Sequence, residues 1–339
     1  MLTVSSIYSS RGREVDQAAS AFVDGVTRTR RIVIAGGAGT VGRHLAAALL
    51  ADGRRVDVLS RDPGLARGRL PLGVRAIAWS ARATPELVAA LDGANAVVNL
   101  AGVAIGPLPW TAGRRRAIRE SRLESTRALV EAIGGLPAQR RPSVLVNASG
   151  TDVYVGRDTS PATEATPPGD AFLSRVCVEW EAAARAAESL GVRVAVLRQG
   201  FVLASDAPVL RLLAVPFRLL AGGRLGSGRQ WFSWIHVDDL VDLYRLAIDS
   251  PALDGIVNAT SPSPCRNADL ARALAHVLGR PDWLAAPAWA IRAALGEEAT
   301  LVLGSRRAVP ARALALGFEF GQPDLEAALR DVLGRDRAS

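Results

Sequence analysis

A glycine-rich turn near the start of the chain constrains the fold more than any other feature. Residues 31–42 read RIVIAGGAGTVG, a β-branched strand that runs into glycines and is followed by a helical stretch over residues 44–51. In such a turn the first glycine lets the chain leave the strand, the second lets backbone approach a pyrophosphate, and the third lets the helix lie close to the strand. The helix N-terminus adds N–H groups and a positive dipole. Because the strand and the helix flank the glycines in the required order, we predict a dinucleotide-binding turn. Its predicted contact residues are Gly36, Gly39, Thr40, Val41 and Gly42.

Length and composition indicate a large globular α/β protein. With 339 residues and 49% hydrophobic content, the chain can bury a full α/β core. No apolar run approaches the roughly 18 residues that span a bilayer, so we expect no membrane association. The two cysteines, Cys177 and Cys265, and three scattered histidines predict neither a disulfide scaffold nor a metal site. So few cysteines fit a reducing compartment, and we expect a cytoplasmic protein.

The basic side chains are all arginine. The chain has 41 of them and no lysine, which excludes a Schiff-base lysine or a phosphate-binding P-loop lysine. The net charge of +8 and the pI near 10.8 fit either an anionic ligand or a nucleic-acid surface. A strand-binding groove would interleave aromatic and basic residues, and the chain lacks this pattern, so we expect no nucleic-acid partner.

Short apolar strands alternate with helices through the first 200 residues. Near-continuous apolar strands separated by helices are typical of a parallel sheet that is covered on both faces. We therefore predict an α/β protein with a Rossmann-type, doubly wound parallel sheet. The expected strands after the first are residues 55–60, 75–79, 94–100, 143–149 and 193–197, and the expected later helices are residues 85–91, 112–133 and 172–190.

The pattern becomes irregular beyond residue 201, where a glycine-rich segment and an aromatic patch precede further helices. Ligands of this architecture bind at the carboxyl ends of the strands, so the later segments are expected to form a smaller C-terminal substrate lobe over the cofactor. The predicted division is a mobile N-terminal extension (1–30), a nucleotide-binding domain (31–200), a substrate lobe with segments that return to the core (201–284), and a small C-terminal domain (285–335).

The end of the second strand indicates which dinucleotide is bound. An acidic residue at this place bonds the ribose 2′-hydroxyl of NAD. This chain has Ser60 and Arg61 instead, and a hydroxyl beside a guanidinium suits a 2′-phosphate. The position therefore favours NADP(H). The alternative is that Arg61 only pairs with the neighbouring Asp62 at the surface.

Several further motifs occur in order along the chain. Together they resemble the extended and atypical short-chain dehydrogenase/reductase superfamily, and within it the epimerase-family proteins, which have a nucleoside-diphosphate-sugar epimerase-like core and a small C-terminal domain of unknown function. The resemblance covers residues 31–333. The motifs that carry it are Asn99–Gly102 (NLAG), Trp110-Thr111, Ser121-Arg122, Pro167–Asp170 (PPGD), Trp180-Glu181, Arg198–Leu203 (RQGFVL), Trp234–Leu240 (WIHVDDL), Gly296-Glu297, Val309-Pro310 and Gly317–Phe320 (GFEF).

The resemblance implies an NADP(H) site with contacts beyond the glycine turn. These contacts are Ser60, Arg61, Leu100, Ala101, Gly102, Arg122 and the backbone near Val202. The small residues after the fourth strand would let the chain pass beside the cofactor. Arg122 has an alternative interpretation, because it recurs with Arg115 and Arg119 at helical spacing, as on a solvated face.

The usual catalytic pair of the superfamily is missing. Its tyrosine donates a proton and its lysine lowers the tyrosine's pKa, but the corresponding positions hold Leu173 and Cys177. The remaining candidates for catalysis are Ser149, Thr151 and Tyr154 after the fifth strand, with an exposed polar turn as the alternative. Asp152 is a possible base or a turn-forming residue. His236 is expected to have a structural role in a strand-to-helix turn, with Asp238 as the N-cap residue of the helix.

Three hypotheses for function follow from these residues. The first is an NADP(H)-dependent oxidoreductase or epimerase-like enzyme that acts on a carbonyl or alcohol of a small molecule, with nucleotide-linked substrates among the options. The second is a cofactor-binding regulator or scaffold that has lost catalysis. The third is an RNA-binding member of the same family. The sequence leaves the oligomeric state and the substrate open.

Overall fold

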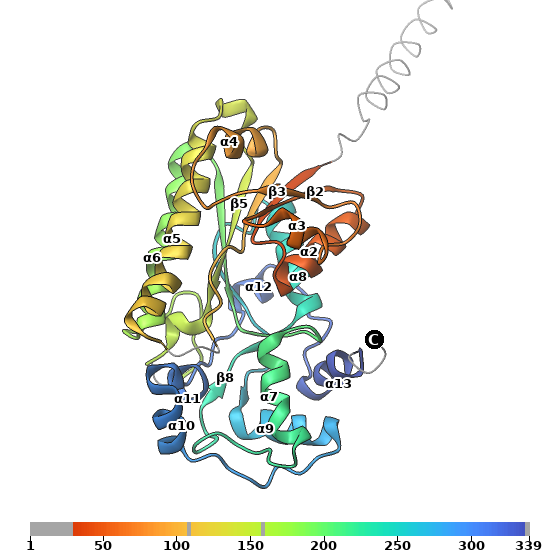
Figure 1. Ribbon diagram of the computed structural model, residues 1–339, viewed down its shortest axis with the longest axis vertical. Coiled ribbons are helices and arrows are strands. Elements are labelled where there is room, and N and C mark those ends of the chain that lie inside the picture. Colours follow the sequence, from red (N-terminus) through yellow and green to blue (C-terminus); the bar gives the residue numbers. More distant parts are fainter. Residues whose placement is uncertain (1–29, 107–109, 157–159, 336–339) are drawn as a thin grey trace, which may run out of the picture.

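The computed structural model describes residues 30–106, 110–156 and 160–335. The predicted N-terminal extension therefore lies outside the described residues, apart from Arg30. Figure 1 shows a sheet layered between helices, with a smaller lobe beyond one end of the strands.

The main sheet of the described residues has seven strands, all parallel, in the order β10-β6-β5-β4-β1-β2-β3. The strand order reverses between β1 and β4, which is the place where this architecture binds its ligands. This confirms the predicted doubly wound α/β fold. The strands are β1 (Arg31–Ala35), β2 (Arg55–Ser60), β3 (Arg75–Ala78), β4 (Ala96–Asn99), β5 (Val144–Gly150), β6 (Arg193–Gln199) and β10 (Gly255–Ala259).

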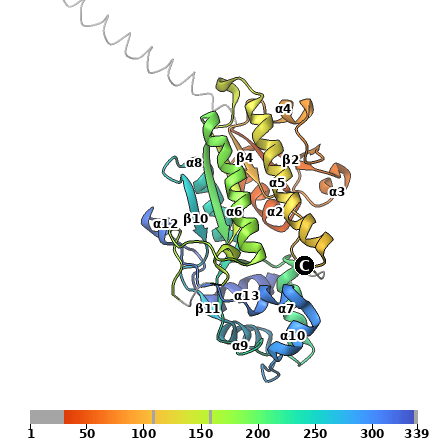
Figure 2. The same cartoon turned by 90° about the vertical axis from the view of Figure 1, so that its left-hand side faces the viewer.

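Each face of the sheet is covered by its own helices (Figures 1 and 2). Alternate strand residues face opposite sides, so Ile32 and Ile34 pack against α2 and α8, whereas Val33 and Ala35 pack on the side of α4, α5 and α6. The bounds are α2 (Thr40–Ala51), α3 (Pro63–Arg67), α4 (Pro85–Leu91), α5 (Ala112–Gly134), α6 (Phe172–Arg185) and α8 (Val237–Asp249), with short 3₁₀ helices η1 (Ala138–Arg140), η2 (Thr151–Tyr154) and η3 (Ala186–Leu190).

The smaller lobe has its own apolar core, built from α7, α9, α13 and short strands. Its two small sheets pair β7 with β9 in parallel and β8 with β11 antiparallel. The bounds are β7 (Phe201–Leu203), α7 (Pro208–Arg218), β8 (Trp231–Phe232), β9 (Trp234–His236), β11 (Cys265–Arg266), α9 (Asn267–Leu278), α10 (Ala288–Leu295), η4 (Gly296–Ala299), α11 (Thr300–Leu303), α12 (Ala311–Ala315) and α13 (Leu325–Arg335).

Two predicted helix boundaries are wrong by more than one residue, and the strand predicted over residues 94–100 is shorter, at Ala96–Asn99. The first helix begins at Thr40 rather than at residue 44, because Gly42 lies in its first turn instead of in the loop. The helix predicted over residues 172–190 ends at Arg185 and continues as η3, where the tighter turns lead into Gly191 in a left-handed conformation. The sequence also gave no indication of α3, or that β10 extends the main sheet beside β6.

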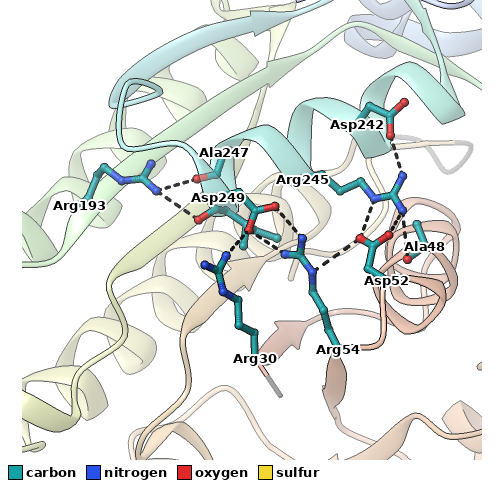
Figure 3. Close-up of polar contacts among 10 residues, drawn as sticks. Arg30, Ala48, Asp52, Arg54, Arg193, Asp242, Arg245, Ala247 and Asp249 are labelled. Atoms are coloured by element: carbon teal, nitrogen blue, oxygen red, sulfur yellow. Dashed lines mark hydrogen bonds and ion pairs between the residues drawn. The ribbon is translucent and has the colours of Figure 1, made fainter. Parts of the chain in front are cut away.

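A cluster of ion pairs holds α8 at the amino ends of the strands (Figure 3). Arg245 of α8 donates to Asp52 at the end of α2, with Nε 3.0 Å from Oδ2. Arg54 donates to Asp249 at the other end of the cluster, with Nη2 2.6 Å from Oδ2. Partly exposed pairs of this kind each stabilise a fold by at most about 1 kcal/mol. The cluster lies at the amino ends of the strands. The carboxyl ends, at the opposite edge of the sheet, are therefore left open for a ligand-binding site.

Candidate functional site

A cavity of about 360 Å³ lies at the carboxyl ends of the central strands, between the glycine turn and α6. Its position at the reversal of strand order is the one expected for a dinucleotide site. It is lined by Gly36, Gly39, Thr40, Val41, Gly42, Leu100, Ile105, Arg122, Ala148, Ser149, Gly150, Asp152, Leu173, Val176, Cys177, Trp180, Gln199 and Gly200. All five predicted residues of the glycine turn are among them.

The three glycines of the turn meet different surroundings. Gly36 has φ +75°, and a Cβ there would lie 2.8 Å from the backbone of Leu100. A Cβ on Gly42 would lie 2.5 Å from the Cα of Gly37. A Cβ on Gly39 would have only the carbonyl oxygen of Gly36 nearby, at 3.5 Å. Packing of the protein therefore requires glycine at 36 and 42, whereas at 39 the open space suits the close approach of a ligand.

The first turn of α2 fits a phosphate group. Gly39 is the N-cap residue, and no side chain caps the helix. The first backbone N–H groups of a helix lack partners within it, and together with the helix dipole they bind anions. The turn therefore offers N–H donors beside the open space at Gly39.

Arg122 of α5 is separated from the arginine-rich face of its helix. Arg115 and Arg119 pair at the surface with Glu297 and Glu179. Arg122 instead is buried, lines the cavity, and stacks 5.2 Å from the ring centroid of Trp180. Its Nη1 donates to two backbone carbonyls, and burial lowers its pKa below the usual arginine value. The guanidinium is thus a positive charge fixed at the cavity wall.

The other predicted cofactor contacts are spread around this cavity. Leu100 lines it, whereas Ala101, Gly102 and Val202 do not. Gly102 packs against Arg122, since a Cβ there would lie 3.1 Å from the guanidinium carbon.

Ser60 and Arg61 lie at the end of β2, outside the cavity lining. Arg61 is exposed, and the Asp62 carboxylate accepts the Leu65 N–H at 2.9 Å as the N-cap of α3. No ion pair joins Arg61 and Asp62, both of which the structure describes, so the alternative surface pairing is absent. The Arg61 side chain is available to an anionic ligand.

Ser149 lines the cavity and is the only one of the three catalytic candidates to do so. It lies at the end of β5, and its hydroxyl donates to Glu181 Oε1 at 2.6 Å. Glu181 also receives two hydrogen bonds from Arg198, at 2.8 and 2.7 Å. This buried network fixes the orientation of the Ser149 hydroxyl.

Tyr154 and Thr151 lie in η2, away from the cavity lining. The Tyr154 hydroxyl donates to Asn258 Oδ1 at 2.8 Å and accepts from Arg198 Nη1 at 2.8 Å. Burial raises the pKa of Tyr154, although Arg198 opposes this. Thr151 is buried as well. The alternative of an exposed polar turn is therefore wrong, because Ser149, Thr151 and Tyr154 are all buried.

The positions of the missing catalytic pair do face the cavity. Leu173 and Cys177 both line it from α6. Burial, with smaller contributions from Asp152 and Glu181, raises the pKa of Cys177 to about 12. A thiol of this kind neither ionises near neutral pH nor supplies the positive charge of a lysine.

One contact at the cavity was not predicted. The Asp152 carboxylate lines the cavity and pairs with Arg306, which lies more than 150 residues further along the chain. Nothing in the sequence around Arg306 distinguishes it from the other arginines. Gln199, Gly200 and Trp180 also line the cavity without having been predicted.

His236 has a structural role, as expected, but His236 itself and not the predicted Asp238 is the N-cap residue, because α8 already begins at Val237. Its Nδ1 accepts the Asp238 N–H at 3.2 Å, which caps α8, and its Nε2 lies 3.1 Å from Asp331 Oδ2. Ligand atoms of these three residues lie within 4.8 Å of one another, but both imidazole nitrogens already make hydrogen bonds.

Among the helices in the described ranges, none is both long and apolar enough to cross a bilayer.

The fold and the cavity define a Rossmann-type protein of the short-chain dehydrogenase/reductase and epimerase class. Residues 32–259 match the NAD dependent epimerase/dehydratase family, and residues 286–332 match a domain of unknown function, DUF1731. The chain belongs to this family, with DUF1731 as its C-terminal region. The resemblance inferred from the motifs is thereby confirmed.

Relatives occur in plants and animals. The chain is 39% identical over 310 residues to "Epimerase family protein SDR39U1 homolog, chloroplastic" of Arabidopsis thaliana, covering 89% of this chain and 86% of that protein. It is 35% identical over 308 residues to the human epimerase family protein SDR39U1, covering 89% of this chain and 99% of that protein.

Solved structures share the fold. The human SDR39U1 (isoform2) structure with NADPH has a TM-score of 0.79 and 32% identity, covering 90% of this chain and 99% of that one. A nucleoside-diphosphate sugar epimerase from Corynebacterium glutamicum has a TM-score of 0.72 and 33% identity, covering 90% of this chain and 58% of that one. A Thermus thermophilus UDP-glucose 4-epimerase, with 20% identity and a TM-score of 0.73, covering 91% of this chain and 99% of that one, shares the fold alone.

Proposed function

We propose that this protein binds NADP(H) and exchanges hydride with a carbonyl or alcohol carbon of a small-molecule substrate. The observation that carries the proposal is the cavity itself, which joins the glycine turn of β1 and α2 to polar side chains at the end of β5. The NADPH present in the human SDR39U1 structure supports the choice of cofactor.

Different residues of the chain bind different parts of the cofactor. The N–H groups at the start of α2 hold the pyrophosphate, and Gly39 leaves room for it. Ser60 and Arg61 hold the 2′-phosphate, since arginine offers paired donors to phosphate oxygens. The remaining proposed contacts, from the ends of β4 and β7 and from α5, are Leu100, Ala101, Gly102, Val202 and Arg122.

For the reacting end we propose that Ser149 contacts the oxygen of the substrate, with Thr151 and Tyr154 supporting the wall behind it. Ser149 donates its hydroxyl hydrogen to Glu181, so the lone pairs of the serine oxygen are left to accept a hydrogen bond from a substrate hydroxyl. A nucleotide-linked substrate agrees with the epimerase family. A cofactor-binding protein without turnover is the second candidate, favoured by Leu173 and Cys177 at the positions of the catalytic pair.

Calorimetric titration with NADPH and NADH tests the cofactor proposal. We expect NADPH to bind more tightly, and Arg61→Leu to weaken NADPH binding by roughly ten- to a hundredfold while NADH binding is unchanged. Arg67→Leu is the matched control, because Arg67 is an exposed arginine of the neighbouring helix α3. If wild type binds neither form, or Arg61→Leu leaves the preference intact, the proposal is wrong.

Absorbance at the nicotinamide band, followed in single turnovers with a panel of carbonyl compounds and nucleotide sugars, separates the two candidates. Oxidation of bound NADPH by any member supports an enzyme. Tight NADPH binding without any turnover supports the regulator or scaffold.

The cytoplasmic location and the domain boundaries at residues 31, 201 and 285 are likewise proposals. The scarcity of cysteine supports the first, and the separate apolar core of the smaller lobe supports the second. Cell fractionation tests the location, and limited proteolysis with mapping of the cleavage sites tests the boundaries.

A further inference from the structure

Asp152 is an acidic side chain at the reacting end of the cavity. It follows β5 in η2, and its side chain lines the cavity together with Ser149 and Cys177. Both hydrogen bonds to its carboxylate come from Arg306 and reach Oδ1, at 3.0 and 2.7 Å. No described residue donates a hydrogen bond to Oδ2. One carboxylate oxygen is therefore fixed, and the other keeps its lone pairs for a ligand.

Arg306 is built into the C-terminal region as a rigid support. It is buried, and besides Asp152 it donates to the carbonyl oxygens of Thr300, Leu301 and Gly304 at 3.1 to 3.3 Å. A guanidinium has five N–H donors, and these contacts use all of them. The carbonyl groups of α11 and of Gly304, which follows it, thus hold Arg306 in one orientation. Since residues 286–332 are the DUF1731 match, a domain without a known function supplies this contact.

Few other groups at this end of the cavity can exchange a proton. Of the lining residues, only Arg122, Asp152 and Cys177 have titratable side chains. Arg122 remains a cation at neutral pH, and Cys177 stays a neutral thiol because its pKa is raised to about 12. The position that normally holds the tyrosine is Leu173. A carboxylate is thus the remaining proton acceptor.

We propose that Asp152 Oδ2 is the proton-transfer group of this site and that Arg306 of the C-terminal region positions it. The inference rests on the proposed function. In the oxidative direction, the C–H bond of a substrate alcohol breaks and hydride goes to C4 of the nicotinamide of NADP⁺. The O–H bond breaks, its proton passes to Asp152 Oδ2, and the electron pair left on oxygen forms the C=O bond. Reduction runs the same steps backwards, with protonated Asp152 as the donor.

The charge of the nicotinamide ring provides a test that needs no substrate. The ring is cationic in NADP⁺ and neutral in NADPH, so an ionised carboxylate beside it favours the oxidised form. We expect Asp152→Asn to weaken the binding of NADP⁺ relative to that of NADPH about fivefold, as measured by the ratio of their dissociation constants in calorimetry. Asp92→Asn is the matched control, because it also removes a carboxylate paired with an arginine, Arg140, away from the cavity. It leaves the ratio unchanged.

The role of Arg306 is tested by coupling between the two residues. If Arg306 positions Asp152, then Asp152→Asn changes the ratio of the NADP⁺ and NADPH dissociation constants much less in an Arg306→Gln background than in wild type. A purely structural Arg306 would lower the melting temperature and leave the effect of Asp152→Asn intact. Should Arg306→Gln not fold, Arg306→Lys is used in its place. Lysine keeps the positive charge but lacks the planar set of N–H donors, and the effect of Asp152→Asn is compared in the same two backgrounds.

The outcomes separate this inference from the proposed function. Failure of wild type to bind either NADP⁺ or NADPH overturns both. Tight NADPH binding with no change of the ratio in Asp152→Asn overturns only the role of Asp152. A full fivefold change that persists in the Arg306 variant overturns only the role of Arg306.

Discussion

The two walls of the cavity achieve their chemistry in different ways. The wall formed by β1 and α2 acts through backbone, since its glycines and helix N-terminus offer N–H groups and space. The wall formed by the end of β5 and by α6 presents side chains, and Leu173 and Cys177 line it where the family resemblance places the usual tyrosine and lysine. The comparison teaches that a backbone site persists as long as a few glycines remain, whereas a side-chain site changes with single substitutions.

The largest expected effect concerns the side-chain wall. Glu181→Ala removes the partner of Arg198 and leaves a buried charge, which we expect to lower the free energy of unfolding by about 3–5 kcal/mol. Glu188→Ala is the control, because its pair with Arg185 is solvent-exposed and should cost at most about 1 kcal/mol. Urea denaturation measures both. Equal losses would show that the Glu181 network does not support this wall.

The backbone wall is tested next, at Gly42. A Cβ there meets the backbone of Gly37 at 2.5 Å, and backbone cannot move aside as a side chain can. We expect Gly42→Ala to lower the free energy of unfolding by about 2–3 kcal/mol and to weaken NADPH binding as well. Urea denaturation and calorimetry measure the two effects. Unchanged stability would mean that the close contact of α2 with the turn is not required.

Gly39 offers the opposite behaviour within the same wall. Its φ is −75°, a Cβ there has open space, and serine is a favourable N-cap residue. We expect Gly39→Ser to leave the unfolding free energy within about 0.5 kcal/mol of wild type and to weaken NADPH binding about tenfold. A variant that loses stability but keeps its affinity would contradict a ligand-facing role for Gly39.

The smallest effect concerns the contact of α2 with the smaller lobe. Asp206 accepts hydrogen bonds from Arg43 and from His44, whose Nε2 lies 3.2 Å from Oδ1. Burial raises the pKa of Asp206, but the bonds from Arg43 and His44 outweigh it and leave the pKa below its ordinary value. We expect Asp206→Asn to cost about 1 kcal/mol at pH 7.

The pH dependence of that cost has a definite sign. A carboxylate with a lowered folded-state pKa contributes stability above its unfolded value, about 3.9, and loses it as the pH falls through the folded value. The difference between wild type and Asp206→Asn should therefore shrink below about pH 4. Urea denaturation at pH 7 and pH 3.5 measures it, and a constant difference would show that the Asp206 charge contributes nothing.

Much of the nucleotide-binding half could be predicted from the sequence because its signals are local. The strand over residues 55–60 and the helix over residues 85–91 have the predicted bounds, since apolar periodicity and a proline at the helix start define them. The glycine turn could be predicted because Gly36, Gly39 and Gly42 lie within seven residues of the chain. The start of α2 was misplaced because a glycine inside a helix resembles one in a loop.

The other half of the site depends on contacts between distant residues. Tyr154 was a candidate because of its place after β5, but its hydroxyl is taken up by Asn258 and Arg198 from two other strands. Asp152 could equally be a turn residue until Arg306 is seen beside it. None of these three contacts is identifiable from the sequence, because the two residues of each contact lie at least 44 residues apart in the chain.

The sequence by itself determined the doubly wound sheet, the glycine turn and the absence of a lysine-assisted tyrosine, because each depends on residue types at short spacing. Only the tertiary structure decided which polar groups face the cavity and which form hydrogen bonds in buried networks. It also decided that the C-terminal region contacts the residues after β5. Those outcomes depend on burial and on pairing across long stretches of chain, and local sequence does not encode them in a readable form.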